Sequence, residues 1–157
     1  MIATGTCFLR GDQVDGTVRG TVTFEWDDTE EVLIKGTIEG LKPGKHGLYV
    51  CAFGNVVNGN SSSGVHYNPC DKKHGGPNDE ERHVGDLGNV EANDDGVAKF
   101  EMHDRLLRLA GNYSVIGHAL VVTENEDDLG KGENDESLVA GNAGKGLAWG
   151  VIGIANK

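Results

Sequence analysis

The chain has 157 residues and a formal net charge of −11, and this acidic balance argues against nucleic acid and against an anionic membrane surface as partners. The length fits one domain, residues 1–157, that buries a core of its own. No apolar run approaches the length of a membrane span, and the first residues carry neither a basic region nor an apolar signal segment. We therefore expect a cytoplasmic protein without a membrane partner.

Apolar and polar side chains alternate with period two through most of the chain, which predicts β-strands. In one such segment Val22, Phe24 and Trp26 share a face. In chain order, strands are expected at 2–10, 17–26, 32–40, 46–53, 96–104, 119–124 and 147–155. The 25 glycines and the polar segments between them fit short turns, and no segment keeps a helical period. The predicted class is all-β, a sandwich or barrel of seven or eight strands.

Two segments interrupt this pattern. Residues 54–86 and 124–146 are long, polar and rich in glycine. Loops of this length in a compact domain are usually functional or disordered. The first long loop carries three of the six histidines, which indicates a function there.

The first long loop contains a possible set of metal ligands. With seven, eight and two residues between them, these are His66, His74, His83 and Asp86. Three imidazoles and one carboxylate complete a tetrahedral site for Zn²⁺ with no open position, so such a site is structural. Bound metal would also keep a loop with few apolar residues ordered. From spacing alone, the alternative is three surface histidines in a charged loop.

The three cysteines do not form a disulfide framework, because their number is odd and their spacings are unrelated. Cys7 lies among apolar strand residues and is expected in the core. Cys70 lies in a polar loop. Cys51 and Tyr49 share one face of the predicted strand. A reactive thiol beside a bulky phenol distinguishes this face from the rest of the segment.

Several stretches resemble those of a known family. They read NPCDKKHGGPNDEERHVGDLGNV (68–90), DDLGKG (127–132), GNAG (141–144) and GVIGIA (150–155). They resemble the zinc loop, the second long loop and the last strand of the copper/zinc superoxide dismutases, and the similarity extends over essentially the whole chain. The resemblance implies an eight-stranded Greek-key barrel, a sandwich-type architecture that in this family is usually a homodimer.

The resemblance assigns the zinc ligands to the histidines and the aspartate of the first long loop, and His66 is the one that in the family bridges zinc and copper. The other three copper ligands of the family are histidines. Here those positions hold Tyr49, Cys51 and Thr123.

Other positions that the resemblance singles out also differ from the family. They are its active-site arginine, its lysine and threonine that attract and gate superoxide, and the two cysteines of its intrasubunit disulfide. In this order they correspond to Gly146, Val139, Ala140, Asn60 and Trp149. Lys145 is adjacent to the arginine position.

These departures predict a degenerate copper site. Dismutation needs a metal that changes its oxidation state by one electron, and Zn²⁺ is redox-inert. We therefore expect zinc but not copper, and a zinc-stabilised binding or regulatory relative without normal dismutase activity. The alternatives are a superoxide dismutase with weak activity or with an atypical metal, and a copper buffer in which Cys51 and His66 form a soft site for Cu(I).

In the family, the aspartate that corresponds to Asp127 hydrogen-bonds one zinc histidine and one copper histidine. Asp127 is therefore expected to orient His74. Because the copper-side partner corresponds to Tyr49, we expect the Tyr49 hydroxyl to take over that contact. The remaining histidines have no expected ligand role: His46 is expected to make structural hydrogen bonds, and His103 and His118 to face solvent.

The family's dimer interface corresponds to an apolar set that this chain retains: Phe53, Gly54, Ile116, Gly117, Val151 and Ile154. We expect a two-fold homodimer. A mixed dimer with an active superoxide dismutase, or contact with a copper chaperone that recognises the fold, would use related surfaces. Without the disulfide cysteines, zinc is expected to matter more for the order of the first long loop.

Overall fold

The computed structural model describes residues 3–11 and 17–156. The strands of these residues are β1 (Ala3–Gly11), β2 (Arg19–Trp26), β3 (Val32–Glu39), β4 (Gly44–Val50), β5 (Val57–Asn60), β6 (Asp86–Ala92), β7 (Ala98–Asp104), β8 (Ala119–Thr123), β9 (Gly146–Val151) and β10 (Gly153–Ile154). One short helix, α1 (Ser137–Ala140), lies in the second long loop. In this part of the chain, no helix has the length and apolar character needed to cross a membrane.

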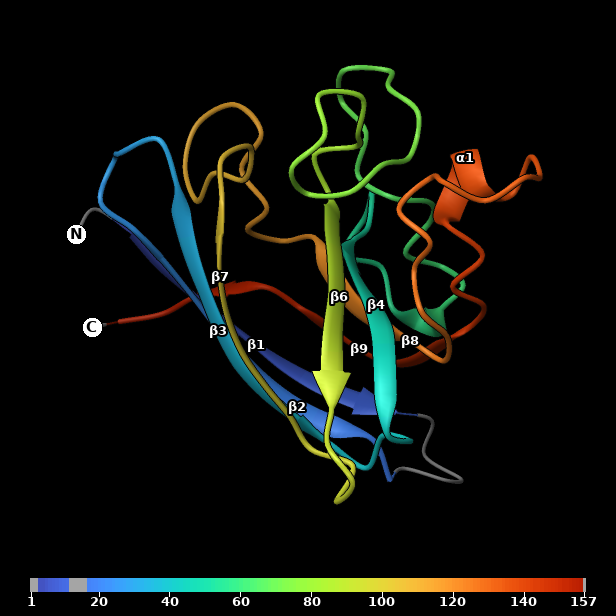
Figure 1. The fold of residues 1–157 in the computed structure, drawn as a ribbon. Helices are drawn as coiled ribbons and strands as arrows, with labels where there is room; N and C mark the ends of the chain where they lie inside the picture. Colours follow the sequence, from blue (N-terminus) through green and yellow to red (C-terminus); the bar gives the residue numbers. More distant parts are fainter. Residues whose placement is uncertain (1–2, 12–16, 157) are drawn as a thin grey trace.

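Eight antiparallel strands follow one another around a nearly closed barrel, in the order β6-β4-β8-β9-β1-β2-β3-β7 (Figure 1). The two strands at the ends of this order, β6 and β7, contact each other. The connections from β3 to β4 and from β7 to β8 join strands that are not neighbours, as in a Greek key. The short β10 pairs with β1. The predicted all-β barrel is confirmed.

The alternating sequences build this barrel because one face of each strand enters a common core. Val22 and Phe24 of β2 are fully buried. Thr21, which lies between the buried Gly20 and Val22, is exposed on the opposite face. Burial of such apolar surface stabilises the fold by roughly 25 cal/mol per Å². Cys7 of β1 packs in the same core, as predicted, and burial raises the pKa of its thiol to about 12.

The structure differs from the predicted strands in three places. The short β5 (Val57–Asn60) lies within the predicted long loop 54–86. The periodicity does not reveal β6, because Gly88, with a φ of 77°, and Asn89 interrupt its apolar pattern. The predicted strand 147–155 is divided at Ile152, which turns fully inward between β9 and β10. The first predicted strand, 2–10, is confirmed from Ala3 onward, since residue 2 lies outside the described ranges.

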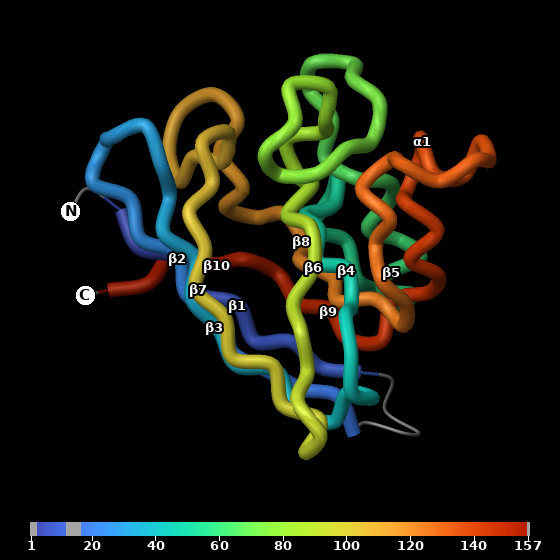
Figure 2. Tube along the Cα trace, in the orientation of Figure 1, coloured from blue at the N-terminus to red at the C-terminus, as the bar shows by residue number. Residues whose placement is uncertain are grey.

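The two long loops lie on the same side of the barrel, beside β4 and β6 (Figure 2). A backbone hydrogen bond of 3.0 Å from the His74 N–H to the Leu138 carbonyl joins one loop to the other. Asn89 of β6 anchors the second loop: its amide donates to the Asp127 carbonyl (2.9 Å) and accepts from the Asp127 N–H (2.8 Å). The polar residues of both loops therefore meet beside β6.

Candidate metal centre

The four predicted zinc ligands come together at the start of β6. His66, which pairs with Cys51 in an isolated antiparallel bridge, meets His74 and His83 of the first long loop and Asp86 of β6. All four residues are buried, and one ligand atom from each lies within 4.8 Å of the others. Throughout the described ranges, no other group of three or more histidine, cysteine and acidic side chains meets in this way.

Asp86 organises the cluster with its two carboxylate oxygens. Oδ1 lies 2.8 Å from Nδ1 of His66, 3.0 Å from Nδ1 of His74 and 3.1 Å from Nδ1 of His83. Oδ2 accepts hydrogen bonds from the backbone N–H groups of His83 (2.8 Å) and Gly75 (3.0 Å). One oxygen is therefore fixed by the loop backbone, while the other faces three imidazole nitrogens.

His74 supplies the clearest indication that the cluster fits a metal cation. Its Nε2 lies 2.6 Å from Oδ1 of Asp127, so this nitrogen carries the proton and donates it. Its Nδ1 is buried and has no hydrogen-bond partner, since the nearby Asp86 oxygen does not lie in the direction of a hydrogen bond. A buried polar atom without a partner is costly, and a metal ion at the centre of the cluster would bind this nitrogen once it has lost its proton.

The donor set fits zinc. Three imidazole nitrogens and one carboxylate oxygen, at Zn–ligand distances of about 2.0–2.2 Å, form a closed tetrahedral site. Its edges would be about 3.3 Å for those bond lengths, close to the 2.8, 3.0 and 3.1 Å that separate the Asp86 oxygen from the three nitrogens. The metal would join the first long loop to β6 and, through His74 and Asp127, to the second long loop.

The cluster is strongly coupled electrostatically. Burial would raise the pKa of Asp86, but the three histidines that face it outweigh burial and hold that pKa well below its usual range. Burial lowers the pKa of His66. Burial also acts against the charged form of His74, but its contacts with Asp127 and Asp86 prevail and raise its pKa to about 9. Metal binding must therefore displace a proton from the neutral-pH cluster.

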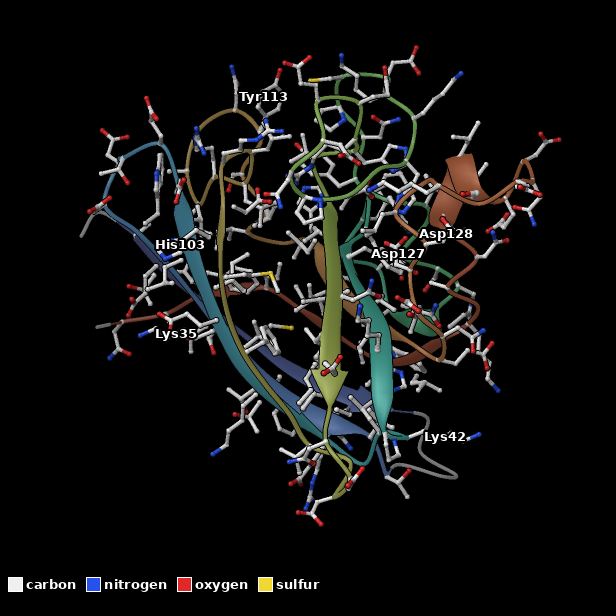
Figure 3. The ribbon with its side chains drawn as sticks, viewed as in Figure 1. Lys35, Lys42, His103, Tyr113, Asp127 and Asp128 are labelled. Carbon is white, nitrogen blue, oxygen red and sulfur yellow. The ribbon has the colours of Figure 1, made fainter. Side chains whose placement is uncertain are left out.

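Asp127 holds His74 from the second long loop, the contact that the resemblance implies. Its Oδ1 also accepts from the Leu129 N–H (2.8 Å). Figure 3 shows Asp127 and Asp128 close together in the second long loop. Gly141, with a φ of 70°, closes this corner, because a Cβ there would overlap Oδ1 of Asp127 and lie 2.7 Å from Nε2 of His74. Sequence reasoning missed Gly141, although its place in the GNAG stretch was a signal.

The expected contact between the Tyr49 hydroxyl and Asp127 is wrong. The hydroxyl instead lies beside Asn60 and Cys51, and burial first, then Cys51, raises the pKa of Tyr49 well above its usual range. The phenol ring lies on the His66 imidazole, with centroids 3.9 Å apart and planes inclined by 21°. Tyr49 therefore contacts the metal cluster through its ring rather than through Asp127.

Cys51 is fully buried beside Tyr49. Its sulfur accepts a hydrogen bond from the Ser63 hydroxyl (3.3 Å), and burial raises the pKa of the thiol to about 11. The thiolate that would bind a soft metal is thus disfavoured at neutral pH. All three cysteines are free.

Thr123 is fully buried, and its hydroxyl forms hydrogen bonds with backbone groups of neighbouring residues. It accepts from the Gly47 N–H (2.8 Å) and donates to the Asn125 carbonyl (2.8 Å). Its donor and acceptor capacities are therefore engaged in joining β4 to the end of β8.

The other positions that differ from the family fall into two environments. Val139, on α1, is exposed, and Ala140 next to it is half-buried. Gly146 lies under the Asn60 side chain, because a Cβ at Gly146 would be 2.6 Å from Nδ2 of Asn60. Trp149 lies against Gly59, where a Cβ would be 3.0 Å from the indole ring.

The histidines outside the cluster have structural contacts. His46 is buried, with Nδ1 2.8 Å from the Thr123 carbonyl and Nε2 2.8 Å from the Lys42 carbonyl. His103 is exposed on β7, on the opposite side of the view from Asp127 in Figure 3. Solvent exposure is wrong for His118, which is half-buried, bonds the Cys51 carbonyl through Nδ1 (2.8 Å) and packs on Tyr67.

Comparison with known proteins matches this geometry. The sequence profile of a family described as copper/zinc superoxide dismutase matches residues 18–152. The chain is similar to copper/zinc superoxide dismutase 5 of Dictyostelium discoideum, with 46% identity over 150 residues that cover 95% of this chain and 96% of that protein. It is also similar to copper/zinc superoxide dismutase A of Xenopus laevis, with 52% identity over 148 residues, 94% of this chain and 95% of that protein.

Proposed function

This chain belongs to the copper/zinc superoxide dismutase family, and from that premise we propose that it is a zinc-binding member without normal dismutase activity. Zinc holds the fold together, and the protein acts by binding a partner rather than by turning over superoxide. Zinc supplies no electron, because it has a single accessible oxidation state. His66, His74, His83 and Asp86 are its ligands.

The observation that carries this proposal is the contrast between two sets of side chains. Nδ1 of His74 in the zinc cluster is buried and lacks a hydrogen-bond partner. At the three positions that the resemblance assigns to copper ligands, a phenol, a thiol and a hydroxyl each have partners within the protein. Redox-active copper binds well in sites rich in imidazole ligands. The phenol, thiol and hydroxyl at these three positions do not form such a site. We therefore infer that copper is not a resident cofactor.

The surface around the second long loop supports the same proposal. Val139 and Gly146 provide no cation at positions where the family attracts its anionic substrate. With a net charge of −11 on the chain, the long-range field repels superoxide. Lys145 is exposed beside Gly146 and is the nearest cation in sequence.

A partner-binding role is consistent with the retained apolar face. Phe53, Val151 and Ile154 are 62%, 41% and 82% exposed. Exposed apolar residues of this kind mark interaction sites. We propose that they form a homodimer in the cytoplasm, and that the same face permits a mixed dimer with an active superoxide dismutase. Contact with a copper chaperone is a further arrangement that the fold allows.

The alternative function is a superoxide dismutase with weak or atypical-metal activity. Its support is the family itself, since both relatives named above are copper/zinc superoxide dismutases by description. Under this alternative, the position beside Cys51 and His66 holds a redox metal in place of the family's copper.

Metal analysis of the reconstituted protein separates the two functions. The purified chain is incubated with excess copper and zinc, freed of loose metal and assayed for dismutation on the same sample. About one zinc per chain with background activity supports the proposal, whereas stoichiometric copper with rapid turnover contradicts it. The converse variant combines Tyr49→His, Cys51→His and Thr123→His, which is expected to bind copper where the unmodified chain does not.

A further inference from the structure

Five of the positions that differ from the family meet in one place. Tyr49, Cys51 and Trp149 belong to a second hydrophobic cluster, separate from the barrel core, together with Ala119, Val121 and Val56. Asn60 contacts Tyr49 from the first long loop, and Gly146 lies beneath Asn60. The substituted residues are therefore packed against one another and against the metal cluster.

The contacts form a continuous chain that ends on a zinc ligand. The absence of a side chain at Gly146 leaves room for the Asn60 amide. The Asn60 amide and the Cys51 thiol both lie beside the Tyr49 hydroxyl. The Tyr49 ring then lies nearly parallel on the imidazole of His66 at 3.9 Å.

His66 is thus held on three sides. Its Nδ1 lies 2.8 Å from Oδ1 of Asp86. Its backbone pairs with Cys51 in an antiparallel bridge, which places the two side chains on the same face. Cys51 is fixed in turn by its N–H bond to the Ala119 carbonyl (2.8 Å) and by Ser63 (3.3 Å). The Tyr49 ring covers one face of the His66 imidazole and thereby restricts the rotation of the imidazole.

We propose that Tyr49 is a positioning residue for zinc binding: by stacking on the His66 imidazole, the Tyr49 ring orients that imidazole toward the metal. This inference rests on the zinc binding proposed above. Asn60 and Cys51 fix the rotation of Tyr49, and Gly146 admits Asn60. A histidine that is oriented before the metal arrives loses less freedom on binding, so the stack strengthens zinc affinity.

The test measures zinc affinity by competition with a chromophoric chelator on the full-length chain. Tyr49→Leu removes the ring but keeps an apolar side chain, and it is expected to weaken zinc binding about tenfold, as changes in groups that orient a metal ligand do. Tyr49→Phe keeps the stack and is expected to stay within about threefold, which corresponds to one lost hydrogen bond. Gly146→Ala displaces Asn60 and is expected to match Tyr49→Phe.

Tyr113→Leu is the matched control, because Tyr113 is exposed on a different loop (Figure 3), where its hydroxyl accepts a hydrogen bond from Cys70. It is expected to leave zinc affinity unchanged. Cobalt bound in place of zinc gives a second readout, since its visible absorption reports ligand geometry. The spectrum should change in Tyr49→Leu and stay the same in Tyr49→Phe.

Two results would overturn the inference, and they are distinguishable. If Tyr49→Leu binds zinc as tightly as the unmodified chain with an unchanged cobalt spectrum, the ring only fills space, even if the metal-free variant melts at a lower temperature. If the unmodified chain itself fails to retain zinc, the proposed function fails, and this inference fails with it.

Discussion

The zinc cluster and the neighbouring cluster around Tyr49 and Cys51 lie on either side of the same imidazole, yet they satisfy their polar groups in opposite ways. In the first, side chains converge on a centre, and Nδ1 of His74 is left without a partner. In the second, the phenol of Tyr49 and the thiol of Cys51 pack together with Trp149, and the Asn60 amide lies beside the phenol hydroxyl. The ability to bind a metal therefore depends on ligand atoms that have no partner within the protein. The mere proximity of polar residues is not enough.

The largest expected effect comes from Asp86→Ala, which removes the oxygen that faces all three histidines. The variant should retain no zinc, and its free energy of unfolding should fall by about 3–5 kcal/mol, as when one partner of a buried charged network is removed. Metal analysis and denaturant unfolding provide the measurements. Asp94→Ala, in an exposed turn, is the control. Full zinc content in Asp86→Ala would show that the cluster is not the binding site.

Removal of zinc by a chelator should come next in magnitude. A ligand present at about a thousand times its dissociation constant stabilises the folded state by about 4 kcal/mol. For a domain of this size, its removal should lower the melting temperature by on the order of 10 °C. Calorimetry before and after chelation measures this shift. A melting temperature that does not move would mean that the loops are held without metal.

Asp127→Asn should weaken zinc binding by about 10–100-fold, since it replaces the carboxylate that fixes the His74 tautomer. Chelator competition measures the affinity. Asp128→Asn is a closely matched control, because Asp128 bonds Ser137 and Asn142 rather than a histidine of the cluster. Equal losses in the two variants would indicate general loosening of the second long loop.

Thr123→Val should have the smallest effect and should separate the two regions. It preserves shape and removes the side-chain hydrogen bond to Gly47, whose N–H still donates to the Asn125 carbonyl (3.0 Å), so the cost is about 1 kcal/mol of folding free energy. Zinc affinity should not change. Denaturant unfolding and chelator competition on the same preparation measure both quantities, and weaker zinc binding here would contradict the independence of the two regions.

The sequence predicted much of the fold and the four residues of the metal cluster, because period-two alternation and motif spacing are local properties. It did not predict β6, whose pattern Gly88 and Asn89 interrupt. The direction of the Tyr49 hydroxyl was also beyond it, since that direction depends on space above Gly146, almost a hundred positions away along the chain. His118 and Gly141 were missed for the same reason: their roles arise from Cys51, Tyr67, Asp127 and His74, which approach them only in the folded chain.

The indole of Trp149 over Gly59 also bears on how the polypeptide matures. This contact joins the last strands to the first long loop through packing, and all three cysteines remain thiols. No electron acceptor is then needed to complete the fold at this junction. The protein can reach its final state in a fully reducing compartment, and thiol reductants should leave its unfolding curve unchanged.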